Sequence, residues 1–182
     1  MPPAEPIRTV LQAGRHRLSL GRTCEAVELV RAHPRRAGQL VECLWDDDPG
    51  VAGRAAHAIE ELSQSQPALF LPWKAELLGL LSETTQNKQR WCLALCVPRL
   101  SLNETECQRA TSTLETYLED SSSIVKTCAL QALADLSHQH PPLRPIVLDL
   151  LRLHGRSGTP AMRARCRILL IIMEKFEEFA PL

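Results

Sequence analysis

The feature that most constrains this chain of 182 residues is a helical pattern that occurs four times. In each copy, five mostly apolar positions fall at i, i+4, i+7, i+8 and i+11, which is one face of an α-helix. We call these the repeat positions: Val51, Ala55, Ala58, Ile59 and Leu62; Gln89, Leu93, Cys96, Val97 and Leu100; Val125, Ala129, Ala132, Leu133 and Leu136; Met162, Cys166, Leu169, Leu170 and Met173. Successive copies are 38, 36 and 37 residues apart, so the chain contains an internal repeat.

A second predicted helix precedes each copy, so each unit is a helix pair. These first helices also carry one apolar stripe, and they lie near 38–45, 72–82, 106–119 and 143–153. Proline is favoured in the first turn of a helix and disfavoured inside one, which helps to place the boundaries. We expect prolines to open first helices at Pro34, Pro72 and Pro145, and second helices at Pro49 and Pro160.

Two further details refine these boundaries. Asp48 and Thr159 precede the second-helix prolines and are predicted N-caps. Pro98 falls inside a second helix, where it removes the hydrogen bond to the carbonyl of Ala94. We expect that helix to kink or end there.

Helix pairs that cannot bury their faces alone stack into an α-solenoid. The pattern Val-Lys-x-x-Ala-x-x-Ala-Leu-x-x-Leu at 125–136, after an acidic and polar turn, resembles the HEAT repeat, and the resemblance covers roughly 38–173. The chain is also similar to a bacterial HEAT-like family without assigned activity. We therefore predict an all-α fold, a right-handed α-solenoid of about four HEAT-like helix pairs. Residues 1–182 would form a single domain, with 1–36 as a partial N-terminal cap that includes a helical start near 22–32, and 37–182 as the repeats.

Composition argues against several classes of protein. Lys+Arg and Asp+Glu balance at 21 each, which removes any overall attraction to nucleic acid or anionic membrane, although both ends are basic and the middle is acidic. The seven cysteines include no closely spaced pair of the CxxC kind and no secretory signal precedes them, so we expect free thiols and a cytoplasmic protein. The longest apolar run, 168–173, is too short to cross a membrane.

Basic residues mark a candidate partner surface. In HEAT repeats the position after the conserved valine is often Arg or Lys, bonded to Asp in the turns, and here it holds Ala52, Arg90, Lys126 and Arg163. The resemblance implies a ladder of ion pairs between units, but the turns before Arg90 and Arg163 contain no acid. If second helices line the concave surface, as in the family, a partner-binding stripe that attracts anions is the alternative, made of Arg90, Lys126, Arg163 and Arg165.

No catalytic or metal-binding motif is present, so we expect no enzyme activity, no metal and no cofactor. Cys92 and Cys96 are four residues apart and His138 and His140 follow the third unit, but buried thiols that fill core positions explain the cysteines better than a zinc site. Three tryptophans together with Arg90 are also the residue types of an aromatic and basic groove for a nucleobase, as in HEAT-like alkylpurine DNA glycosylases. Helix packing is the simpler role for Trp45, Trp73 and Trp91.

The last predicted helix, Arg163–Phe179, is apolar around more than one face, whereas solenoids usually end in a polar surface. Either another part of the chain covers it, or Phe176 and Phe179 help to bind a partner protein or form a homodimer. The predicted function is therefore a non-enzymatic scaffold or adaptor that binds another protein. A nucleic-acid-binding HEAT-like protein is the alternative, and a DNA-repair glycosylase relative is the least favoured.

Overall fold

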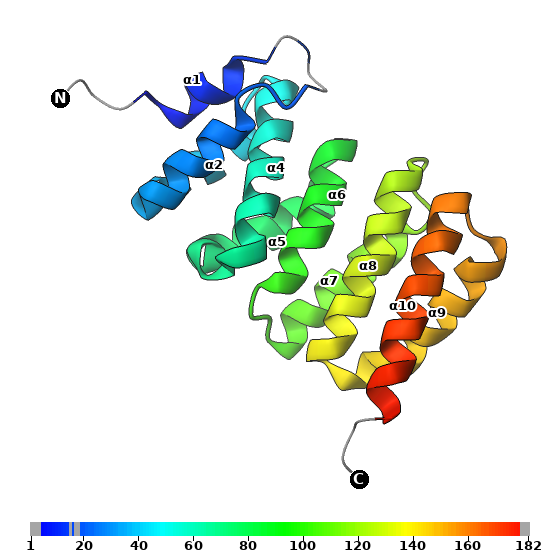
Figure 1. The fold of residues 1–182 in the computed structure, drawn as a ribbon. Helices are drawn as coiled ribbons and strands as arrows, with labels where there is room; N and C mark the ends of the chain where they lie inside the picture. Colours follow the sequence, from blue (N-terminus) through cyan, green and yellow to red (C-terminus); the bar gives the residue numbers. More distant parts are fainter. Residues whose placement is uncertain (1–4, 15, 17–18, 179–182) are drawn as a thin grey trace. The chain divides into compact units, whose positions relative to one another are not determined.

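The computed structural model describes residues 5–14, 16 and 19–178, with side chains as far as Glu174. In this part of the chain all regular structure is helical, which confirms the predicted all-α class. The chain divides into two compact units, Met1–Leu100 and Ser101–Leu182. Figure 1 shows the helices of each unit.

The α-helices of the first unit are α1 (Ile7–Gln12), α2 (Thr23–Ala32), α3 (Ala37–Glu42), α4 (Pro49–Ser65), α5 (Lys74–Glu83) and α6 (Asn87–Cys96). Short 3₁₀ segments lie between them: η1 (Pro34–Arg36), η2 (Cys43–Trp45), η3 (Pro67–Trp73) and η4 (Val97–Arg99). In the second unit the helices are α7 (Glu104–Tyr117), α8 (Ser123–Gln139), η5 (Pro141–Leu143), α9 (Arg144–Ser157) and α10 (Pro160–Glu178). The predicted first and second helices are therefore all present.

The repeat positions form the core of both units. All of them are buried except Leu170, which is half-buried. In the first unit, α4 packs against α2, α3 and α6. In the second unit, α8 packs against α7, α9 and α10. The predicted burial of these positions is thus confirmed, although Val97 and Leu100 lie beyond the end of α6.

The helix ends follow the predicted chemistry in most places. The Asp48 carboxylate accepts a hydrogen bond from the Gly50 amide at 2.7 Å, and the Thr159 hydroxyl accepts one from the Met162 amide at 3.3 Å. Helix α6 ends at Cys96, just before Pro98. Pro34 and Pro72 differ from the prediction, because Pro34 opens a 3₁₀ turn and Pro72 lies inside η3, so that α5 begins at Lys74.

The N-terminal segment is fastened to α4 by one buried arginine. Arg54 is only 2% exposed, and its Nε donates to the carbonyl of Leu11. Its Nη1 lies 3.4 Å from the carbonyl oxygen of His16. A Cβ at Gly14 would lie 2.5 Å from this guanidinium, so the close approach requires a glycine there. These carbonyl oxygens replace the hydrogen bonds to water that the guanidinium loses when it is buried.

Replacing Ala132 with Arg tests the packing of the repeat positions. Ala132 is fully buried in α8, so Ala132→Arg should lower the free energy of unfolding by several kcal/mol, roughly 3–5, by burying an unpaired charge. Urea unfolding followed by circular dichroism measures the change. The control is Ser112→Arg at an exposed position of α7, which should change stability by no more than about 0.5 kcal/mol. Equal stability of the two variants would contradict the register.

Candidate functional site

The four basic residues predicted as a partner-binding stripe lie on second helices, Arg90 in the first unit and the others in the second. Arg90 is half-buried, and its Nε donates to the carbonyl of Thr84 at 2.8 Å. Lys126 is half-buried on α8. Arg163 and Arg165 are exposed on α10, and the Arg165 Nη1 lies 3.3 Å from the Gln131 side-chain oxygen on α8. The stripe stays a prediction, since its members belong to both units.

Two contacts bear on the alternative of an ion-pair ladder. Arg90 uses its guanidinium to satisfy a carbonyl at the end of α5, where helices leave such groups without a partner. In the turn before α8, the Asp120 carboxylate accepts from the Ser122 amide at 2.7 Å and so stabilises its own turn. Both contacts lie within a single turn, and the ladder between repeats stays a prediction.

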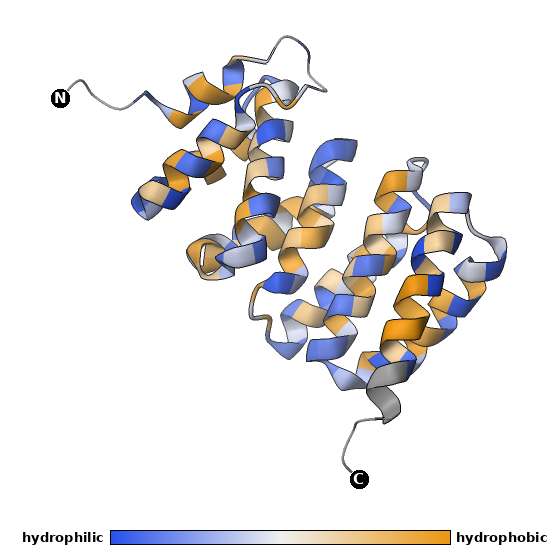
Figure 2. Ribbon diagram, in the orientation of Figure 1, coloured by the Kyte–Doolittle hydropathy of each residue, from blue (hydrophilic) through white to orange (hydrophobic). Residues whose placement is uncertain are grey.

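The exposed part of α10 carries a cluster of apolar side chains. Ile168, Ile171 and Ile172 are 51%, 56% and 41% exposed, and we call them the α10 patch. Figure 2 shows hydrophobic turns along this part of the helix. The opposite side of α10 holds Cys166 and Met173, both fully buried, so the helix is apolar on two faces, as predicted.

Several contacts hold α10 in place and so fix which side faces outward. It packs against both α8 and α9. The Arg144 guanidinium of α9 donates to the carbonyl of Met173, and the hydroxyls of Ser123 and Thr159 lie 2.8 Å apart. The α10 patch is therefore presented on a fixed helix.

The two phenylalanines predicted as partner contacts are not described. Phe179 and the side chain of Phe176 both lie outside the described residues. The α10 patch itself contains residues that the prediction noted as apolar but did not select. A helical wheel centred on the repeat positions of α10 would have placed Ile168 and Ile171 on the outer side.

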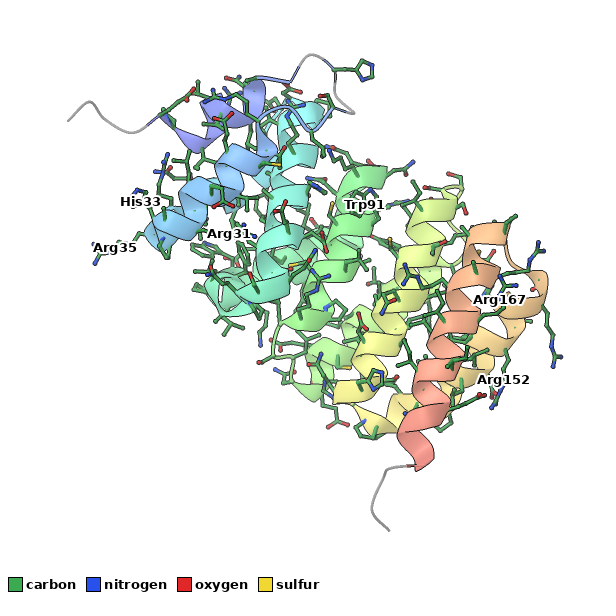
Figure 3. All side chains as sticks on the ribbon, viewed as in Figure 1. Arg31, His33, Arg35, Trp91, Arg152 and Arg167 are labelled. Atoms are coloured by element: carbon green, nitrogen blue, oxygen red, sulfur yellow. The ribbon has the colours of Figure 1, made fainter. Side chains whose placement is uncertain are left out.

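Another group of side chains lies on the surface of α4 and α6 in the first unit. The rings of His57 and Trp91 meet edge to face, with centroids 5.7 Å apart and planes at 68° (Figure 3 labels Trp91). The stem of Lys88 crosses Gly53, where a Cβ would lie 3.1 Å from its Cδ. The Lys88 ammonium and His57 Nδ1 are both buried, and within the described residues neither has a hydrogen-bond partner.

Burial shifts the protonation of this group. It lowers the pKa of His57, and the nearby Lys88 ammonium lowers it further. Burial also lowers the pKa of Lys88. Both shifts act against the charged forms, so His57 is held as the neutral imidazole. Composition alone had not singled out this pair, because only the fold brings α4 and α6 together.

The cysteines are placed as packing residues. No disulfide joins any of the seven, all of which lie in the described part, and five of them are buried. Burial raises the pKa of Cys43 and of Cys96 to about 11, and it also raises the pKa of Cys107 and Cys166. At neutral pH these thiols are protonated and poorly nucleophilic.

The described residues contain no cluster of three or more His, Cys, Asp or Glu side chains arranged to hold a metal ion. Among them, no helix is long and apolar enough to span a bilayer, α10 included as far as it is described.

Comparison with known proteins gives a likeness of fold. No protein-family model matches the chain, and no curated protein matches it. A crystal structure of an engineered protein from the Northeast Structural Genomics Consortium is similar, with a TM-score of 0.63 and 14% sequence identity. The alignment covers 93% of this chain and 79% of that protein. At this identity the likeness concerns the fold alone.

The protonation of His57 predicts how stability depends on pH. Because its pKa is lower in the folded chain, the unfolded chain binds a proton more readily, and stability rises with pH through the window below the ordinary value of about 6.5. His57→Gln removes this dependence, so the variant should lose less stability than the parent between about pH 7.5 and about pH 5.5. Urea unfolding at a series of pH values measures the difference.

The matched control is His33→Gln, an exposed histidine of the same unit. Its stability should follow the parent curve over the whole pH range. Parallel curves for His57→Gln and the parent would contradict the prediction, because they would show that His57 binds a proton equally well in the folded and the unfolded chain.

Proposed function

We propose that the chain is a non-enzymatic protein-interaction module, a scaffold or adaptor of the HEAT-repeat type, and that its partner is another protein. The observation that carries the proposal is the α10 patch, three isoleucines each 41–56% exposed on one fixed helix. Soluble monomers rarely leave such a contiguous apolar surface in water, and one of this kind marks an interaction site. A second copy of the chain is one possible partner.

The size of the patch indicates how much of an interface it supplies. Since each isoleucine is already half-buried, covering it adds roughly 1 kcal/mol. Three such contributions do not exceed the cost of association, about 4 kcal/mol or more. We therefore infer that the patch is the centre of a larger surface, to which the predicted contacts Phe176 and Phe179 would belong.

The state of the cysteines supports a non-enzymatic role in a reducing compartment. Thiols whose pKa is raised by burial are poor nucleophiles, and seven unbridged cysteines are typical of a cytoplasmic protein. The four predicted stripe residues remain candidate contacts within this proposal: Arg90, Lys126, Arg163 and Arg165.

Nucleic-acid binding is the second candidate, and one observation favours it. Arg163 and Arg167 are exposed four residues apart on α10, and Arg152 and Arg156 are exposed on the neighbouring α9 (Figure 3 labels Arg152 and Arg167). Such a surface can meet phosphates. Salt separates the two candidates, because binding through phosphate contacts weakens steeply with salt and binding through an apolar surface does not.

The double variant Ile168→Glu/Ile172→Glu tests the proposal. It should abolish partner capture, or self-association where the partner is a second copy, because it places charges in an apolar contact. Because both side chains are more than 40% exposed, the free energy of unfolding should fall by no more than about 1–2 kcal/mol, so the variant stays folded. Sedimentation velocity and capture of partners from a lysate, with and without nuclease, are the measurements.

Leu71→Glu is the matched control, because Leu71 is as exposed as Ile172, at 41%, but lies in the first unit. It should leave capture and sedimentation unchanged. Capture that survives in the double variant, together with unchanged sedimentation, would reject the α10 patch. Capture that disappears on nuclease treatment would favour the nucleic-acid candidate instead.

A further inference from the structure

A small open pocket lies in the first unit, where η2 meets the turn between α5 and α6. It has a volume of about 300 Å³, and the residues that shape the argument are Trp45, Asp46, Glu83, Thr84 and Gln89. We call it the Trp45 pocket. Its volume is at the low end for ligand sites, about 300–1,000 Å³, and suits one long side chain better than a large cofactor.

Trp45 is the most unusual residue of this pocket. Its side chain is 51% exposed, although a tryptophan gains more than any other residue from burial. The other two tryptophans are at least half-buried: Trp73 lies against Gly38, and Trp91 lies against His57. An exposed indole beside a concavity is typical of a recognition residue, because tryptophan is enriched where interfaces concentrate their binding energy.

The charges of the pocket select the ligand. Its two carboxylates are Asp46 and Glu83, and none of its lining residues in the described part is basic. Asp46 is neutralised from outside by Arg8, whose Nε and Nη2 lie 2.5 and 3.1 Å from its carboxylate oxygens. Glu83 is exposed and makes no hydrogen bond or ion pair with the described residues.

The position of Glu83 strengthens this field. It is the last residue of α5, and a carboxylate at the C-terminus of a helix adds to the negative end of the helix dipole. Arg90 offsets part of that charge, since it donates to the Thr84 carbonyl of the same turn. The carboxylate of Glu83 nevertheless stays available to a cation from solvent.

The pocket is also held rigid by a buried amide. Gln89 is 2% exposed, its Nε2 donates to the carbonyl of Leu44 at 2.7 Å, and its Oε1 accepts from the Thr84 hydroxyl at 2.6 Å. These bonds tie the residue before Trp45 to the residue after Glu83. The backbone next to Trp45 and the backbone next to Glu83 are thereby held together, and such preorganisation lowers the entropy lost on binding.

We propose that the Trp45 pocket binds an arginine side chain presented by a partner protein. A guanidinium stacks on the indole face through a cation–π interaction, and its planar set of N–H donors matches the Glu83 carboxylate. The guanidinium also brings the positive charge that the lining lacks. This site lies in a different unit from the α10 patch, so either proposal can fail while the other stands.

Titration with a short blocked peptide tests the proposal on the whole protein. The probe is acetyl-Gly-Arg-Gly-Arg-Gly-amide, and the readout is the indole N–H signal of Trp45 in a two-dimensional ¹H–¹⁵N spectrum, assigned by its loss in Trp45→Phe. The expected result is a saturable shift of that signal. The same peptide with citrulline in place of arginine should bind at least about 10-fold more weakly, because it keeps the shape and loses the charge.

Two charge-neutralising variants locate the contact. Glu83→Gln should weaken binding about 3- to 5-fold, whereas Glu76→Gln, an exposed glutamate on the same helix, should leave it unchanged. A lysine peptide that binds as well as the arginine peptide would show that any cation suffices and overturn the guanidinium assignment. Absence of a saturable shift, equal binding of the citrulline peptide, or an unaltered affinity in Glu83→Gln would each overturn the site.

Discussion

The structure depends on a narrow stripe of small, fully buried side chains along its second helices. Ala55, Ala58, Ala129 and Ala132 have no exposed surface, and Cys96 and Cys166 occupy equivalent positions. Small residues at these points let neighbouring helices approach closely, so that the larger repeat positions interdigitate. The same burial raises the pKa of both thiols. The packing that stabilises the fold therefore also keeps the thiols of Cys96 and Cys166 protonated and poorly nucleophilic at neutral pH.

Periodicity predicted this core because it is a property of each helix taken by itself. It missed α1, since six residues are too few to show a helical period, and Ile7, Val10 and Leu11 are nevertheless fully buried. Packing against α2, α3 and α4 stabilises α1, together with the hydrogen bond from Arg54 to the Leu11 carbonyl. Such contacts connect residues about 40 positions apart, and no local pattern encodes them.

The surfaces were less predictable than the core, for a related reason. A helical wheel shows which side of a helix points away from the core. It does not show how much of that side a neighbouring element covers. Trp45 was predicted to pack between helices, and this was wrong: η2 ends directly after it, and its side chain is left 51% exposed. Arg90 illustrates the opposite case, because its position on the helix was foreseen but its bond to the Thr84 carbonyl depends on the shape of one turn. Whether it also joins a basic stripe across repeats remains a prediction.

Departures from the repeat are more informative than its regular positions. Gln89 occupies the place that Val51, Val125 and Met162 hold in the other copies, and it is equally buried. A buried amide gains only about 1 kcal/mol from each hydrogen bond and loses the burial of an apolar side chain, so it is a weak choice for packing alone. What it does, and a valine could not do, is bind both η2 and the α5–α6 turn. The other repeat positions are apolar or small, so a polar residue at one of them indicates that a particular loop geometry is important. Here that geometry forms the wall of the Trp45 pocket.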